Sequence, residues 1–168
     1  MRLSTVAGTM LGIVLLGIPG SLAAAEQSSK LRRGAYLAAI MDCGGCHTPG
    51  TMLGKPDMER HLGGGDVGFE IPGLGIFYPP NLTPDPETGL GAWSEAEVVT
   101  AVRTGVRPDG RVLAPAMPYH AYGSLSDSDA RALAAYLLSR APIRNQVPGI
   151  VGPGEKPAAA YLTVAMPR

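Results

Sequence analysis

Two cysteines and a histidine stand together in the stretch CGGCH, and their types and spacing permit several kinds of chemistry. Cys43 and Cys46 are the two cysteines of the 168-residue chain, and His47 follows the second one directly. A pair with this spacing is compatible with a redox dithiol, half of a zinc site, a disulfide, or the covalent attachment of a haem. The surrounding sequence decides between these four interpretations.

The sequence around the motif favours the haem interpretation. A thioredoxin-like dithiol needs a neighbouring strand–helix unit, and no strand pattern is visible. Zinc needs two more good ligands at suitable spacing; only His47, His61 and His120 are available, and His47 is too close to the cysteines to complete a tetrahedron easily. A disulfide would close a very small loop and add little stability. In the haem interpretation each thiol bonds one vinyl group and His47 is the proximal iron ligand, so the sequence predicts one haem c.

A methionine is the expected sixth ligand, because a thioether opposite histidine favours Fe(II) and raises the potential. The chain after residue 25 offers Met41, Met52, Met58, Met117 and Met166. The first three lie in the helix before the motif or too soon after it, and the last lies in the terminal tail. Met117 stands 70 residues beyond His47, between Pro115 and Pro118, which fix an extended backbone. Met117 is therefore predicted as the distal ligand, with His120 as the competitor for a bis-histidine site.

Three stretches with helical patterns are expected to position these residues. The first, about residues 29–42, has apolar residues at helical spacing and leads directly into the motif. In the second, residues 94–105, Ser94 and Glu97 form a capping box and a glycine stands at the expected end. The third, residues 125–142, begins with Ser126 as N-cap and ends at a proline. With no alternating strand pattern, the prediction is an all-α fold of three to five short helices with long loops.

A long loop separates the first two helices. Residues 48–92 hold 10 Gly and 7 Pro in 45 positions. A loop of this length is unusual inside a compact domain, because ordering its backbone costs about 1–2 kcal/mol per residue. It is understandable if the loop wraps a large buried cofactor that supplies the missing apolar core.

The first 25 residues have the layout of a secretory signal peptide. Arg2 precedes the 13-residue apolar run 6–18, and Ala23 and Ala25 occupy the small positions before a cleavage site. The alternative is a retained membrane anchor, but this run is short of the ~20 residues that a membrane span needs. We therefore expect a signal peptide at residues 1–25, a domain at 26–141, and a Pro/Gly-rich tail at 142–168 that runs over the surface.

The charge balance excludes some partners. The chain has 14 Lys and Arg against 14 Asp and Glu, so it offers no charge argument for binding nucleic acid or an anionic membrane. No run after residue 25 is long enough for a transmembrane span. Export into an oxidising compartment favours disulfides over zinc thiolates. The expected location is a bacterial periplasm, with at most a peripheral association with the membrane.

Several stretches together resemble a known family. RGAYLAAIMDCGGCHT, PPNLTPDPETGLGAWS, AVRTGVRPDG and APAMPY are similar to the class I c-type cytochrome domains of bacterial periplasmic dehydrogenases, including the cytochrome subunits of alcohol and gluconate dehydrogenases. The resemblance covers about residues 33–141. It implies a small all-α fold around one haem, with the first and last helices crossing near Gly34 and Tyr136.

The resemblance also carries over individual residues. It implies haem attachment at Cys43 and Cys46, iron ligation by His47 and Met117, and contacts between the first and last helices that also involve Tyr36 and Leu137. It further implies that three residues line the haem pocket or bond a propionate: Asn81, Thr83 and Trp93.

The expected function is electron transfer rather than catalysis. The resemblance implies a periplasmic carrier between a dehydrogenase donor and a respiratory-chain acceptor. Many relatives carry three CxxCH motifs and a membrane-binding tail, whereas this sequence holds one motif. One alternative is a haem enzyme or gas sensor with an open sixth iron position, although no distal acid–base pair is evident. Another is an accessory module whose long loops dock onto a larger dehydrogenase.

Overall fold

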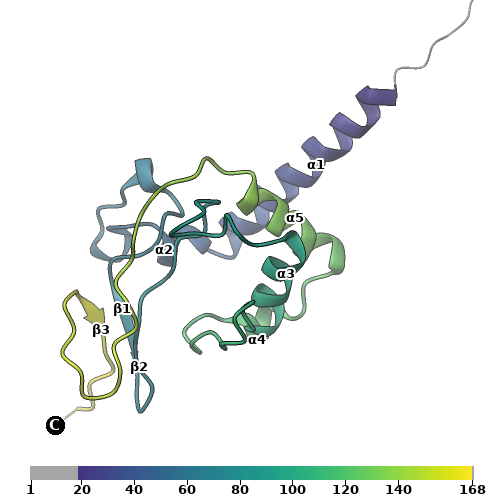
Figure 1. Ribbon diagram of the computed structural model, residues 1–168. Coiled ribbons are helices and arrows are strands. Elements are labelled where there is room, and N and C mark those ends of the chain that lie inside the picture. Colours follow the sequence, from purple (N-terminus) through teal and green to yellow (C-terminus); the bar gives the residue numbers. More distant parts are fainter. Residues whose placement is uncertain (1–18, 168) are drawn as a thin grey trace, which may run out of the picture.

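The computed structural model describes residues 19–167, in which helices and long loops make up most of the molecule and a small sheet lies at one side (Figure 1). The apolar run of the expected signal peptide, residues 6–18, lies outside the described residues. The helices are α1 (Pro19–Ile40), α2 (Cys43–His47), α3 (Glu95–Thr104), α4 (Tyr119–Tyr122) and α5 (Asp127–Leu138), with 3₁₀ turns η1 (Thr51–Leu53) and η2 (Met58–Arg60). No helix within residues 19–167 is both long and apolar enough to cross a membrane.

The long helix α1 carries the chain to the CGGCH motif. It begins at Pro19, earlier than the expected start near residue 29, and its N-terminal part projects from the body of the molecule (Figure 1). α1 crosses α5 at Gly34, where a Cβ atom would overlap the Ala132 carbonyl oxygen and the Tyr136 side chain. The expected contact between Gly34 and Tyr136 is therefore confirmed. Tyr36, expected at the same crossing, is instead exposed on the outer face of α1.

Local caps define the other two predicted helices. Ser94 and Glu97 make both halves of the capping box at the start of α3, and Gly105 ends that helix in the left-handed conformation with φ 77°. The Ser126 side chain accepts a hydrogen bond from the Asp129 amide at the start of α5. Both predicted helix starts are confirmed.

The helices enclose an apolar core beside a cavity. Its centre is Leu133 on α5, which is 1% exposed. The buried members of this core are Leu37, Ala38, Cys43, Leu62, Leu90, Val98, Ala132, Leu133, Ala134 and Leu137. Cys43 thus enters the cavity from a rigid, well-packed helical frame.

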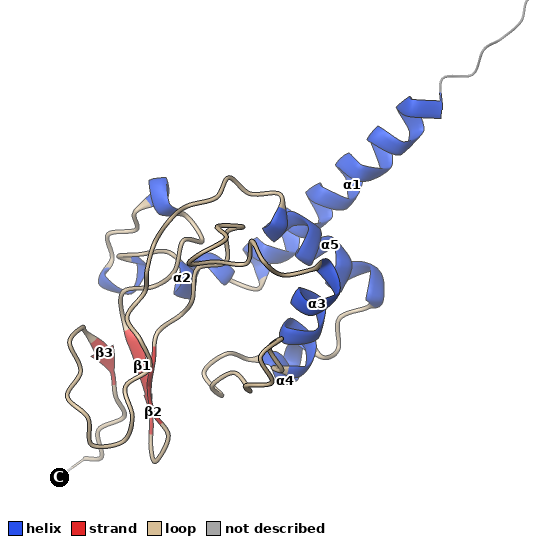
Figure 2. Cartoon of the chain, in the orientation of Figure 1, coloured by secondary structure: helices blue, strands red, loops and turns tan. Residues whose placement is uncertain are grey.

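A small sheet corrects the expectation of an all-α fold. Strands β1 (Gly68–Ile71) and β2 (Gly75–Phe77) form an antiparallel hairpin, and β3 (Tyr161–Leu162) pairs in parallel with β1, giving the order β2-β1-β3 (Figure 2). The strands have four, three and two residues, too few for the alternation that reveals a strand in a sequence. β3 also lies far along the chain from its partner, so only the folded structure brings the two together.

The tail after residue 141 is tied to this sheet. Val151 pairs with Ile76 at the outer edge of β2, while β3 covers the opposite edge of the hairpin at β1. The Tyr78 hydroxyl also donates a hydrogen bond to the carbonyl of Ala159, 3.1 Å away. The tail therefore holds both edges of the hairpin in addition to running over the surface.

Candidate functional site

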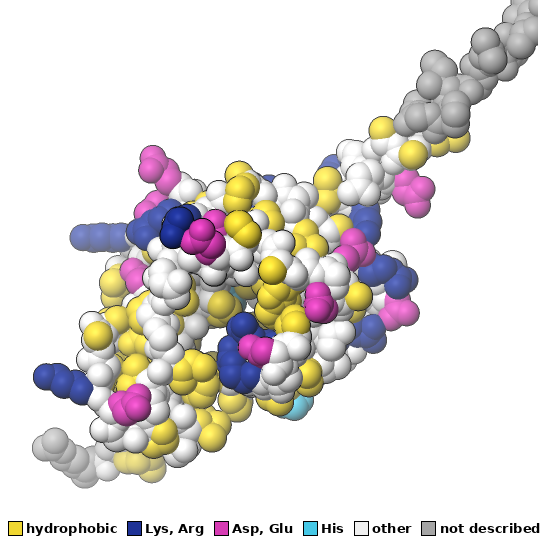
Figure 3. Space-filling view, in the orientation of Figure 1, with side chains coloured by type: hydrophobic (Ala, Val, Ile, Leu, Met, Phe, Trp, Pro, Cys, Tyr) yellow, Lys and Arg dark blue, Asp and Glu magenta, His cyan; other side chains and the backbone are white. Residues whose placement is uncertain are grey.

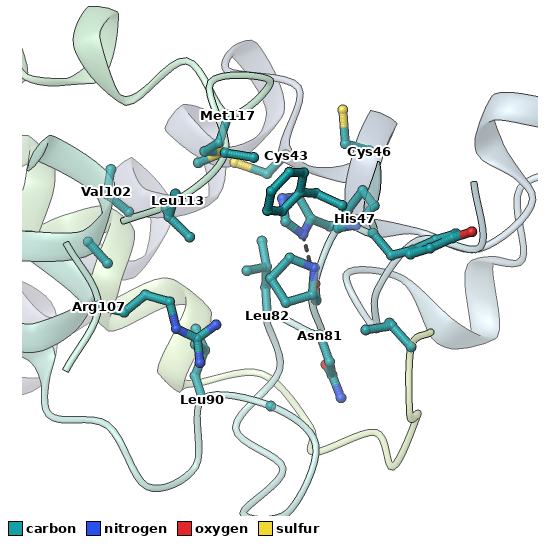
Figure 4. Close-up of a pocket in the computed structure, with 18 of the residues that line it drawn as sticks. Cys43, Cys46, His47, Asn81, Leu82, Leu90, Val102, Arg107, Leu113 and Met117 are labelled. Atoms are coloured by element: carbon teal, nitrogen blue, oxygen red, sulfur yellow. Dashed lines mark hydrogen bonds between the residues drawn. The ribbon is translucent and has the colours of Figure 1, made fainter. Parts of the chain in front are cut away.

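One cavity of about 540 Å³ brings most of the sequence-predicted site residues together (Figure 4). Its lining is mostly apolar and comes from helices α2 to α5, the hairpin β1–β2, the loops between them and the start of the tail. Of the sequence-predicted site residues it includes Cys43, Cys46, His47, Asn81, Trp93 and Met117. In the space-filling view, hydrophobic side chains border a hollow between the sheet and helices α3 and α4, and basic side chains lie beside it (Figure 3). The volume is within the range of ~300–1,000 Å³ that is typical of cofactor pockets.

The short helix α2 fixes the geometry of the CGGCH motif. It follows Asp42, which adopts the left-handed conformation with φ 52° and so separates α2 from α1. Residues three and four apart share one face of a helix, so Cys43 lies on the same side as Cys46 and His47. The motif thus presents two sulfurs and one imidazole to the same cavity.

The two cysteines do not form a disulfide with each other, and their surroundings disfavour the thiolate form. Burial raises the pKa of Cys43 to about 11, and burial also raises the pKa of Cys46. A redox dithiol needs an accessible thiolate, and these environments work against one. Within residues 19–167, no group of three His, Cys, Asp or Glu side chains is placed to hold a metal ion.

The imidazole of His47 is oriented by a backbone carbonyl. His47 is 6% exposed, and its Nδ1 atom lies 2.7 Å from the carbonyl oxygen of Pro80. A carbonyl only accepts, so Nδ1 carries the proton and the lone pair of Nε2 is free. Burial lowers the pKa of His47, which keeps the ring neutral and suitable as a metal ligand.

Met117 reaches the same cavity from a different element. It lies in the loop between α3 and α4, where its amide donates to the Ala114 carbonyl at 2.9 Å. Figure 4 shows Met117 and His47 in the cavity on segments far apart in the sequence. Of the other candidates, His120 is exposed, Met166 is 82% exposed, and neither lines the cavity, whereas Met41 lines it from the segment just before Cys43.

The polar atoms of Asn81 and Thr83 bond to protein groups. Both residues are buried, and the Asn81 side chain donates to the Ile143 carbonyl at 2.6 Å and to the Thr88 hydroxyl at 3.0 Å. Its oxygen accepts from the amide and hydroxyl of Thr83. Thr83 does not line the cavity, whereas Trp93 does. Asn81 and Thr83 thus anchor the segment at Ile143 to the cavity wall.

Two arginines of the cavity were not singled out from the sequence. The Arg107 guanidinium extends into the cavity and lies over the Trp93 ring, 5.2 Å from its centroid (Figure 4). Its buried Nε is 3.3 Å from the carboxylate of Asp109 but makes no hydrogen bond of good geometry with any described residue. Arg111 lines the same cavity, and burial lowers its pKa, with a further contribution from Arg107. A short β-bridge between Val106 and Val112 turns both arginines inward, and no sequence motif marks that turn.

The start of the tail also lines the cavity. Residues 146–150 contribute to the wall near Phe69 and Phe77 of the hairpin. Val147 packs so closely on Gly64 that a Cβ there would overlap it, and the Gly64 amide bonds to the carbonyl of His47 at 2.8 Å. The tail thus packs, through Val147, against Gly64, whose amide bonds to the backbone carbonyl of His47. Its low-complexity composition gave no sign of this position.

The arrangement fits a covalently attached haem. It offers two thiols, an imidazole with a free nitrogen, and a thioether within one apolar cavity. Among the described residues, the Arg107 Nε lies 3.3 Å from the Asp109 carboxylate without a hydrogen bond of good geometry, and a haem propionate would supply a further acceptor for this guanidinium. These are observations on the residues, independent of any relative.

Comparison with known proteins agrees with this assignment. A family model described as Cytochrome c matches residues 31–141, about two thirds of the chain. The chain is 41% identical over 121 residues to a nicotinate dehydrogenase subunit of Pseudomonas putida, covering 72% of this chain and 9% of that protein. It is 33% identical over 146 residues to the cytochrome c subunit of the quinone alcohol dehydrogenase of Gluconobacter oxydans, covering 85% of this chain and 29% of that subunit.

A third relative is also named as a dehydrogenase subunit. The chain is 36% identical over 132 residues to the gluconate 2-dehydrogenase cytochrome c subunit of Pantoea cypripedii, covering 77% of this chain and 28% of that subunit. The chain therefore spans less than a third of the length of each of these three relatives.

Proposed function

The chain belongs to the cytochrome c family, and on that premise we propose that it transfers single electrons with one haem c held by Cys43, Cys46, His47 and Met117. Haem c, when bound, supplies a one-electron iron couple. The observation that carries the proposal is that one cavity joins the CGGCH motif to Met117, although they lie on separate elements. The role is that of a carrier, distinct from the enzyme that oxidises a substrate.

Each residue of this set has a defined task. Cys43 and Cys46 form the two thioether bonds, and the Pro80 carbonyl holds the His47 ring with Nε2 directed to the iron. Met117 would provide a thioether sulfur as the second iron ligand, which would favour the reduced state. The apolar lining excludes water, which also favours the state of lower positive charge.

Arg107 and Arg111 bind the propionates in this proposal. Their guanidinium groups lie at an otherwise apolar cavity, where an anion would compensate their charge. Trp93 supports Arg107 by stacking under it. Asn81 and Thr83 act on the cofactor indirectly, because their polar atoms bond to one another and to Ile143.

The partners follow from the relatives by analogy. Relatives are named as subunits of nicotinate, alcohol and gluconate dehydrogenases, so we propose a dehydrogenase as the electron donor. The proposed acceptor is a component of the respiratory chain, and the proposed location is the periplasm. This location requires residues 1–25 to act as a signal peptide ahead of the cytochrome domain at residues 26–141.

A visible spectrum of the dithionite-reduced protein tests the proposal. We expect sharp low-spin c-type bands that do not change when carbon monoxide is added, because Met117 fills the sixth position. Bands that shift promptly with carbon monoxide would instead indicate an open site and a ligand-binding haem protein. The variant Met117→Ala is the internal comparison: it should bind carbon monoxide and have a lower reduction potential.

A further inference from the structure

The Met117 loop is continuous with α4, a helix of one turn. The Tyr119 amide donates to the Met117 carbonyl at 2.8 Å, and the Tyr122 amide donates to the Pro118 carbonyl at 3.2 Å. Met117 and α4 therefore form one hydrogen-bonded unit. Any contact that holds α4 also limits the movement of the Met117 sulfur.

Two tyrosines anchor α4, and they do so on different sides. The ring of Tyr119 is buried against Gly105, where a Cβ atom would lie 2.9 Å from its carbons. This contact fixes α4 to the end of α3, on the side of the molecule that carries Met117. No hydrogen bond of the Tyr119 hydroxyl is found within residues 19–167.

Tyr122 contacts the short segment between α1 and α2. Its half-buried ring lines the same cavity as Met117, and its hydroxyl donates a hydrogen bond to the carbonyl of Met41 at 2.9 Å. Met41 is one residue past the end of α1 and two residues before Cys43. Carbonyls at a helix end lack a partner within the helix, so the Tyr122 hydroxyl satisfies a group that needs one.

This bond joins the two segments that supply the iron ligands. Met41 belongs to the turn that sets the start of α2, where the left-handed Asp42 changes the chain direction. Tyr122 is the last residue of the helix that follows Met117. The two partners are 81 residues apart in the sequence, so the bond acts as a tertiary clamp across the cavity.

We propose that Tyr122 is a positioning residue whose hydrogen bond to the Met41 carbonyl holds the Met117 turn against the start of the CGGCH motif and keeps the Met117 sulfur on the iron. The inference rests on the proposed function, because it takes Met117 as the sixth ligand. It adds a residue that does not itself ligate the metal. In this view the clamp sets how often the sulfur leaves the iron.

Imidazole titration of the oxidised holoprotein measures this quantity. Imidazole binds only after the sulfur has dissociated, so its apparent affinity reports the fraction of open sites. Imidazole binding is monitored through the loss of the sulfur-to-iron charge-transfer band. We expect Tyr122→Phe to raise the apparent affinity by about 2- to 13-fold, which is the equilibrium equivalent of one typical net hydrogen bond. The ring is retained in this variant, so the cavity wall is kept.

Two comparisons make the test specific. Tyr119→Phe removes a hydroxyl from the same helix and should leave the apparent affinity at the wild-type value. In a Met117→Ala background, Tyr122→Phe should have no further effect, because no sulfur remains to be held. The two tyrosine variants should also share the wild-type content of covalent haem.

Three outcomes would overturn the inference. The first is a wild-type imidazole affinity in Tyr122→Phe. The second is an equal increase in Tyr119→Phe, which would indicate general loosening of α4. The third is the same increase in the Met117→Ala background, which would mean that Tyr122 controls access to the cavity. Failure of the proposed ligand set has a separate signature: Met117→Ala itself would then bind imidazole no more tightly than wild type.

Discussion

The two sides of the haem cavity are built in different ways. On one side, α2 is framed by α1, α3 and α5, and each of these longer helices is specified by residues within its own stretch of sequence. On the other side, the hairpin β1–β2 and the loops beside it are held by the segment 143–151, which bonds to Gly63, Ile76 and Asn81, about 60 to 80 positions earlier in the chain. The helical side is thus defined locally and the sheet side by contacts distant in sequence.

This difference coincides with the extent of the family match. The matched region ends at residue 141, so it includes the hairpin but not the segment that pairs with it and closes the cavity wall. The helical side carries the attachment motif that the family shares. The sheet side is completed by a segment outside the match.

The largest expected effect comes from the attachment motif on the helical side. Cys43→Ala would remove one of the two proposed thioether bonds, so we expect loss of most covalently bound haem. Haem staining after denaturing electrophoresis and the pyridine haemochrome spectrum both measure this. Met58→Ala, at an exposed methionine outside the cavity, is the matched control and should keep its haem. Unchanged covalent haem in Cys43→Ala would contradict the attachment assignment.

The next effect is expected on the sheet side. Asn81 is 1% exposed, and Asn81→Ala removes its bonds to Thr83, Thr88 and Ile143. Leaving a buried polar group unpaired costs about 1–3 kcal/mol, so we expect the free energy of unfolding to fall by ~3 kcal/mol. Denaturant unfolding of the holoprotein measures the change. The segment near residue 143 should also become more sensitive to proteolysis.

A second asparagine provides the control for this prediction. Asn145 is only half-buried, and its side chain donates to the Gly63 carbonyl at 2.8 Å. Asn145→Ala should therefore cost less, about 1 kcal/mol. If Asn81→Ala instead changed the reduction potential at unaltered stability, Asn81 would contact the cofactor directly, as the family resemblance implied.

The features predicted from sequence are those that local chemistry determines. The CGGCH spacing identified the attachment helix, and the Ser94 and Ser126 caps identified the starts of α3 and α5. Met117 was selected because prolines flank it, and the structure places it in the cavity with His47, although its ligation remains a prediction. In each case the signal lies within a few residues of the feature.

The features missed from sequence depend on tertiary contacts. The strands are too short to show an alternating hydrophobic pattern, and β3 is a strand only through its pairing with β1. Nothing in the sequence distinguishes Arg107 from an ordinary surface arginine. In the folded chain a turn directs its side chain into an apolar cavity. Asn81 and Thr83 were expected at the haem by resemblance, whereas their hydrogen bonds lead to Ile143 in the tail.

The smallest predicted effect concerns Arg107, which lies in the loop after α3 and lines the cavity. Arg107→Gln removes a positive charge from a site near the proposed propionates. Because the oxidised haem carries one more positive charge than the reduced haem, this loss stabilises the oxidised form and lowers the reduction potential. We expect a decrease of about 20–60 mV, or up to tenfold in the one-electron equilibrium. Redox titration of the holoprotein, followed at its visible bands, measures this shift.

Arg103 separates a local effect from a general loss of charge. It lies four residues earlier, its guanidinium pairs with Asp127 at 2.6 Å, and it does not line the cavity. Arg103→Gln changes the net charge by the same amount, but Arg103 lies outside the cavity, so the reduction potential should shift less, and raising the ionic strength should remove most of that shift by screening. Arg107 lines the cavity, so its effect should persist in salt. Equal shifts in the two variants would mean that Arg107 acts only through net charge, and the buried Nε would then have no propionate partner.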